Sequence, residues 1–89
     1  MDLTPWKLEF QPGWDIHFAK LDKAIQQQIL RKFGQMKQPL QARGLHSSNY
    51  LVEEAGQYRI AFIQDDGSRV KKIHFVGNHK QYEKWYKKQ

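Results

Sequence analysis

The sequence predicts a two-layer α+β fold, in which an N-terminal strand and two helices pack on an antiparallel sheet of about four strands, with a short C-terminal helix. Apolar and charged residues alternate in residues 6–10, as in a half-buried strand. Apolar residues recur every three or four positions in residues 14–36, as on one face of a helix. Three strand-like segments follow, joined by tight turns, and indicate an antiparallel meander.

Length and composition favour one domain spanning residues 1–89. The chain has 89 residues, and chains divide into separate domains only at several times this length. Hydrophobic residues make up 39% of the sequence and aromatic residues 13%, which is enough apolar material for a folded core.

The first half of the chain is expected to form a strand and two helices. The strand at residues 6–10 ends at the turn Gln11-Pro12-Gly13. The helical stripe consists of Trp14, Phe18, Leu21, Ile25, Ile29, Phe33 and Met36. We expect a break at Leu21-Asp22, where the Asp22 side chain can accept free N–H groups of the second helix, and a helix end near Gly34 and Pro39.

The second half is expected to form a connection, three strands and a helix. Residues 37–48 carry no period and predict an irregular connection. Strands are predicted at residues 49–54, 57–64 and 69–76, and the Asp-Gly within residues 65–68 is a strong hairpin signal. Asn78 can cap a last helix that runs through Lys88.

Strand alternation assigns side chains to the two faces of this sheet. Four apolar residues are expected to meet the helices: Ile60, Phe62, Ile73 and Phe75. Three basic residues are then expected to gather on the uncovered face: Arg59, Lys72 and His74.

All the excess positive charge lies in the last quarter of the chain. The net charge is +6. Residues 1–68 hold eight Lys and Arg against eight acids, whereas residues 69–89 hold seven against Glu83 alone. A local positive field of this kind favours a polyanionic partner, either nucleic acid or an acidic protein segment.

Several classes of function are disfavoured. With no cysteine, the chain has no disulfide framework, no thiolate zinc site and no cysteine nucleophile. The four histidines lack the spacing of a zinc site, and the six glycines are isolated rather than grouped in a phosphate-binding loop. No apolar run is long enough to span a membrane, and the first residues do not resemble a secretion signal, so we expect a cytoplasmic protein without membrane contact.

Two segments resemble a known family. The central strand "GQYRIAF" and the last segment "IHFVGNHKQYEKWY", together with the order of elements, are similar to the RelE/ParE superfamily of toxins from type II toxin–antitoxin systems. The RelE-like and HigB-like members are the most similar. The resemblance implies a RelE-like fold and a metal-free, cofactor-free endoribonuclease that cuts mRNA on the ribosome. It also implies a cognate antitoxin protein as partner.

The resemblance assigns catalytic roles residue by residue. Arg59 matches an arginine that contacts the scissile phosphate, a role suited to the two-pronged guanidinium. His79 matches the place of a proton donor or phosphate ligand. Tyr82 and Tyr86 compete for an aromatic role after it, although packing of a terminal helix explains them, together with Trp85, equally well.

The remaining candidates are less well defined. Lys72, His74, Lys80 and Arg43 are candidate substrate-binding residues, although basic strand residues also serve solubility. Relatives carry lysines on the strand before the central one, one of them a base, and residues 49–54 contain none. The base then has four alternatives: His46, Glu53, Glu54 and His74.

Three functions remain open from the sequence. The first is a ribosome-dependent mRNA endoribonuclease. The second is a ParE-like toxin that binds DNA gyrase without cutting nucleic acid, which the missing lysines favour. The third is a non-catalytic basic module that binds RNA or protein.

Overall fold

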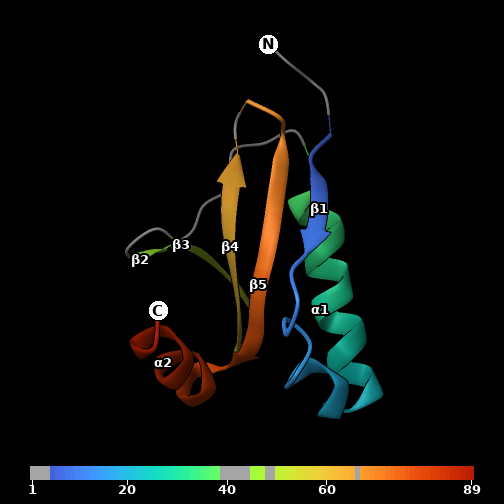
Figure 1. Cartoon of the computed structure of the whole chain (residues 1–89). Helices are drawn as coiled ribbons and strands as arrows, with labels where there is room; N and C mark the ends of the chain where they lie inside the picture. Colours follow the sequence, from blue (N-terminus) through green and yellow to red (C-terminus); the bar gives the residue numbers. More distant parts are fainter. Residues whose placement is uncertain (1–4, 39–44, 48–49, 66) are drawn as a thin grey trace.

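The fold is built on a sheet in which five described strands follow the order β1-β5-β4-β3-β2 (Figure 1). A computed structural model describes residues 5–38, 45–47, 50–65 and 67–89. The strands are β1 (Lys7–Phe10), β2 (Leu45–Ser47), β3 (Tyr50–Ala55), β4 (Tyr58–Asp65) and β5 (Val70–Asn78). β1 runs parallel to β5, and the other neighbours are antiparallel. The predicted α+β class is confirmed.

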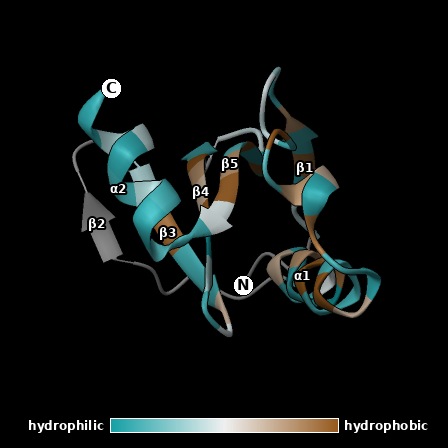
Figure 2. Ribbon diagram, turned by 90° about the horizontal axis from the view of Figure 1, so that it is seen from below, coloured by the Kyte–Doolittle hydropathy of each residue, from teal (hydrophilic) through white to brown (hydrophobic). Residues whose placement is uncertain are grey.

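Two α-helices cover opposite faces of this sheet (Figure 2). α1 (Lys23–Met36) packs on one face and α2 (His79–Lys87) on the other. Within the described ranges, no helix has the length and apolar character needed to cross a membrane.

The predicted helix before Asp22 is only a 3-10 turn, η1 (Phe18–Lys20). The turn that follows β1, with Gly13 at φ +87°, continues through His17, so only residues 18–21 remain before the N-cap of α1 at Asp22. Trp14, Phe18 and Leu21 still pack against the core, as their spacing predicted. One turn of 3-10 helix satisfies that spacing without a regular α-helix.

The irregular connection predicted over residues 37–48 contains a strand. Residues 45–47 pair with the edge of β3, which raises the sheet from the expected four strands to five. Three residues are too few to show a period in sequence. α1 ends at Met36, with Gly34 inside it rather than after it, and Pro39 lies outside the described residues.

A β-bulge at His74 determines which face each residue of β5 occupies. Ala61 pairs with Phe75 and Phe62 pairs with Ile73, so His74 has no partner opposite it. The extra residue shifts the alternation by one position. Ile73 therefore faces α1 while Phe75 faces α2, and the prediction that both face the same way is wrong.

The two faces carry separate hydrophobic clusters. The α1-side core contains Ile29, Phe33, Met36, Ala55, Ile60, Phe62, Ile73 and Val76. The α2-side core contains Val52, Ala61, Phe75 and Tyr82. Alternation places Arg59 and Lys72 on the α2 face, and His74 lies there against Tyr50. The three basic residues do share a face, but α2 covers part of it.

Lys71 is a buried cation in the α1-side layer, only 1% exposed. Its Nζ donates a hydrogen bond of 2.7 Å to the carbonyl of Met36, in the last turn of α1. The ammonium also lies 5.1 Å from the Trp6 ring centroid and 5.6 Å from that of Phe62. Burial lowers the pKa of Lys71, and the Glu53 charge opposes this shift. One of the seven cations of the last quarter is therefore not at the surface.

The start of α2 is fixed by a capping box. The Asn78 side chain accepts a hydrogen bond from the backbone N–H of Gln81, and the Gln81 side chain accepts one from the backbone N–H of Asn78. The prediction for Asn78 is confirmed. Asp22 does occupy the N-cap of α1, but its side chain makes no capping hydrogen bond.

Gly77 lies under this cap. A Cβ there would stand 2.5 Å from Cζ of Phe75 and 2.9 Å from Oε1 of Gln81. Both neighbours are fixed, one by core packing and the other by the capping box, so neither can move freely.

We expect Gly77→Ala to destabilise the fold by about 1–3 kcal/mol, because it overpacks the junction of β5 and α2. Gly34→Ala is the matched control. It lies inside α1, where a Cβ would have no atom of another element within 4 Å, and the substitution should stabilise by about 0.5–1 kcal/mol. Urea unfolding would measure both. If the two substitutions changed the free energy of unfolding by the same amount in the same direction, the close packing around Gly77 would not explain the result.

Candidate active site

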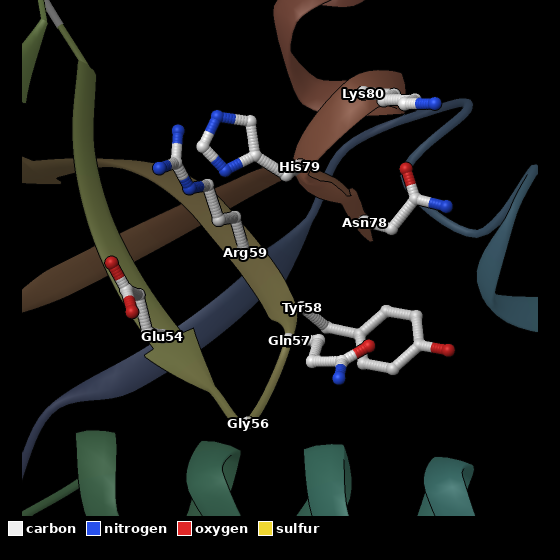
Figure 3. A pocket seen from close by; sticks show the side chains of 8 residues that line it. All are labelled: Glu54, Gly56, Gln57, Tyr58, Arg59, Asn78, His79 and Lys80. Atoms are coloured by element: carbon white, nitrogen blue, oxygen red, sulfur yellow. The ribbon is translucent and has the colours of Figure 1, made fainter.

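A hollow of about 600 Å³ opens where the β3–β4 turn meets the start of α2 (Figure 3). Its polar lining includes Glu54, Gln57, Arg59, Asn78, His79 and Lys80. The pairing of β4 with β5 brings these distant segments together, since Arg59 lies opposite Gly77. The hollow thus joins the two segments that the sequence analysis singled out, and it contains Arg59, His79 and Lys80.

The side chain of Arg59 packs over the ring of Tyr82. It is half-buried, and its Cζ lies 5.1 Å from the centroid of the Tyr82 ring. A guanidinium over an aromatic face is attracted by the negative charge density of the ring. This contact restricts the guanidinium at the edge of the hollow.

Glu54 is the carboxylate that faces the hollow. It lies directly opposite Arg59 in the β3–β4 register, so both side chains project to the same face (Figure 3). Glu53 projects to the other face, where its carboxylate is 3.4 Å from Nζ of Lys32. Of these two candidate bases, only Glu54 can reach a molecule bound at Arg59.

His79 is the first residue of α2 and is exposed. Its Nε2 lies 3.0 Å from Oε1 of Glu83, one turn along the helix. An ionised carboxylate can only accept, so Nε2 carries the hydrogen of this contact and Nδ1 is left for another partner. The backbone N–H groups at the start of α2 add a positive partial charge beside the hollow.

The two tyrosines of α2 pack against the body of the protein. Tyr82 is 5% exposed and belongs to the α2-side core, beneath Arg59. Tyr86 is half-buried and stacks on Tyr82, with ring centroids 5.9 Å apart. Trp85 stacks on Phe75 at 5.0 Å. The packing explanation accounts for all three rings of α2.

His74 and Lys72 lie outside the lining of the hollow. Lys72 is exposed and pairs with Ile63, four residues along β4 from Arg59. His74 packs its ring edge-on against Tyr50 at 5.2 Å. Its Nε2 is buried without a hydrogen-bond partner among the described residues. His74 is therefore poorly placed to act as the base at Arg59.

The last two candidates fall in or near the parts that are not described. The backbone of His46 lies in β2, opposite Leu51, and Arg43 lies outside the described residues. Sequence reasoning missed Gln57 as a lining residue and treated Asn78 only as a cap. Both could have been found from their positions in the sequence. Gln57 lies in the turn just before the strand that carries Arg59, and Asn78 caps the helix that begins at His79.

No cluster of metal-ligating side chains occurs in the described ranges, where three or more of His, Cys, Asp and Glu never converge.

Burial lowers the pKa of the His74 imidazole from 6.5, and the positive charge of Lys72 adds to the shift. The unfolded chain then holds more protons than the folded chain as the pH falls below 6.5. We expect the free energy of unfolding to decrease as the pH falls below 6.5, and we expect this decrease to be smaller in His74→Gln. Urea unfolding at several pH values would measure it. An identical slope in both proteins would contradict the assignment to His74.

The sequence matches no protein-family model and no curated protein. Solved structures do match. A chain of the toxin–antitoxin complex RelBE2 from Mycobacterium tuberculosis is 20% identical with a TM-score of 0.72, over 88% of this chain and 95% of that one.

Two further structures agree with it. A variant of the Escherichia coli toxin RelE in the free state is 17% identical with a TM-score of 0.71, over 91% of this chain and 90% of that one. A chain of the archaeal RelE–RelB complex from Pyrococcus horikoshii is 13% identical with a TM-score of 0.65, over 83% and 94%. The β-sheet, its two helices and their order are therefore those of the RelE toxin fold.

Proposed function

We propose that this protein is the toxin of a type II toxin–antitoxin pair and an endoribonuclease that cuts mRNA on the ribosome in the cytoplasm. The observation that carries the proposal is the convergence of Arg59, His79 and Glu54 on one hollow. In cleavage of an RNA phosphodiester, a cation can stabilise the phosphate charge, while an imidazole and a carboxylate can transfer the two protons.

The reaction uses the RNA's own ribose as nucleophile. The 2′-oxygen attacks the adjacent phosphorus, the bond from phosphorus to the 5′-oxygen breaks, and the products are a 2′,3′-cyclic phosphate and a 5′-hydroxyl. One proton leaves the 2′-hydroxyl and one joins the 5′-oxygen. Water, metal and redox cofactors have no part in this balance.

Each side chain has a role that its position supports. Arg59 donates to the phosphate oxygens, whose negative charge grows in the transition state. Glu54, across the β-ladder, accepts the proton of the 2′-hydroxyl. His79, on the α2 side of the hollow, protonates the departing 5′-oxygen from Nδ1 of its doubly protonated ring and keeps the hydrogen on Nε2. Tyr82 holds Arg59 in place without touching the RNA.

The second part of the proposal is an antitoxin partner. The similar M. tuberculosis and P. horikoshii structures are toxin–antitoxin complexes, as is that of the intact E. coli RelBE complex. The partner expected here is an acidic, amphipathic segment, because the positive excess of this chain lies in residues 69–89. A segment of that kind laid over Arg59 and His79 would close the hollow.

We expect Arg59→Ala to lower the rate of mRNA cleavage in a metal-free cell-free translation reaction by about 10²–10³-fold, because it removes the transition-state cation. His79→Ala and Glu54→Gln should each lower it by about 10²–10⁴-fold, as loss of an acid or base does. Mapping new 5′ ends on the mRNA measures the rates.

Lys20→Ala is the matched control, because it removes an exposed cation in η1, outside the hollow, and should leave cleavage unchanged. Unchanged cleavage by Arg59→Ala and His79→Ala, with folded protein, would refute the catalytic assignment. Intact mRNA together with a block of DNA gyrase supercoiling would replace the nuclease with a ParE-like toxin.

A further inference from the structure

A second hollow, of about 250 Å³, lies between α1 and the end of β3. Gln28, Arg31, Lys32 and Gln35 line it from α1, and Glu54 lines it from β3. Glu54 also lines the candidate active site. The two hollows therefore meet at Glu54, on either side of the β3–β4 turn.

Gly56 allows the turn between the two hollows to lie close against α1. This residue has φ +62°, a conformation that favours glycine, and a Cβ there would stand 2.5 Å from Nε2 of Gln28. Figure 3 shows α1 passing below the turn at Gly56. A flexible chain crossing the turn would thus leave the candidate active site and reach α1 directly.

The α1 side of this second hollow carries donors that are open to a ligand. Gln28, Arg31 and Gln35 are exposed, and the helical spacing of three and four residues puts them on one stripe. Lys32 is engaged by Glu53 at 3.4 Å. Arg31 has no ion pair or hydrogen-bonded partner among the described residues. It is therefore the available cation of this hollow.

The order of charges across the turn selects a ligand class. Glu54 lines both hollows, with Arg59 in the first hollow and Arg31 in the second. An RNA strand alternates phosphates, which guanidinium groups bind, with 2′-hydroxyls, which can donate to a carboxylate. DNA has the phosphates but lacks this donor.

We propose that the hollow at Arg31 is a second nucleotide subsite, which binds the phosphate of a neighbouring nucleotide on the RNA strand that is cut at Arg59. The amides of Gln28 and Gln35 lie beside that phosphate and can donate to and accept from the edge of a base. This inference rests on the proposed function, and it gives the strand a path from α2 across the turn to α1.

The test is a scan of single neutral linkages in a short RNA. Each phosphate of a fluorescent pentanucleotide is replaced in turn by an uncharged methylphosphonate, and affinity is measured by anisotropy with His79→Ala protein, which limits cleavage. We expect two sensitive linkages, each losing about tenfold in affinity. In the same background Arg31→Ala should abolish the sensitivity of one, and Arg59→Ala that of the other.

Lys23→Ala is the matched control, because it removes an exposed cation from the first turn of α1, outside the second hollow. It should leave both sensitive linkages unchanged. A 2′-deoxy sugar between the two linkages should weaken binding to the protein with Glu54 and have less effect after Glu54→Gln.

Three results would overturn the subsite. One is a single sensitive linkage that responds only to Arg59→Ala, which would leave the proposed nuclease standing. Another is equal sensitivity of all linkages with equal losses from Arg31→Ala and Lys23→Ala, which indicates diffuse attraction. The third is no sensitive linkage at all, while Arg59→Ala still lowers cleavage in the translation reaction, which would remove the subsite and leave the proposed nuclease standing.

Discussion

The β-bulge at His74 is the constraint on which the rest of the structure depends. It shifts the alternation of β5, so that Phe75 and Gly77 face α2 and Val76 faces α1. With regular pairing, the end of β5 would present the opposite set of side chains to each face. Phe75 would leave the platform on which Tyr82 packs. The bulge therefore decides on which side α2 can dock, and with it the position of His79 relative to Arg59.

Much of the fold could be predicted because each strong signal was local. Alternation, apolar spacing and the Asn78 cap identified β1, α1, β3, β4, β5 and α2. The errors arose where tertiary contacts decide. β2 exists because the edge of β3 is available to it, and the bulge at His74 leaves no mark in the sequence. The apolar stripe of residues 14–21 is satisfied by η1, since packing requires only the spacing.

The site was predicted in part for the same reason. Arg59 and His79 could be found from the segments that carry them. The hairpin formed by β4 and β5 sets their pairing, which brings the start of β4 next to the end of β5. The choice between Glu53 and Glu54 could not be made, since it depends on which face α1 covers. Tyr82 was ambiguous until its burial was known. Lys71 looked like one more surface cation, and only the packing of Trp6 and Met36 around it shows otherwise.

The parallel pairing of β1 with β5 has a consequence for the order of folding. It joins residues 7–10 to residues 70–73, so the first strand has no neighbour in the sheet until more than sixty further residues have been synthesised. Contacts between such distant segments slow folding and cannot form while the later residues are still being synthesised. The hydrogen bond from Lys71 to the carbonyl of Met36, which joins β5 to α1, forms equally late. A protein built in this way completes its sheet only after residues 70–73 have been synthesised and released from the ribosome exit tunnel.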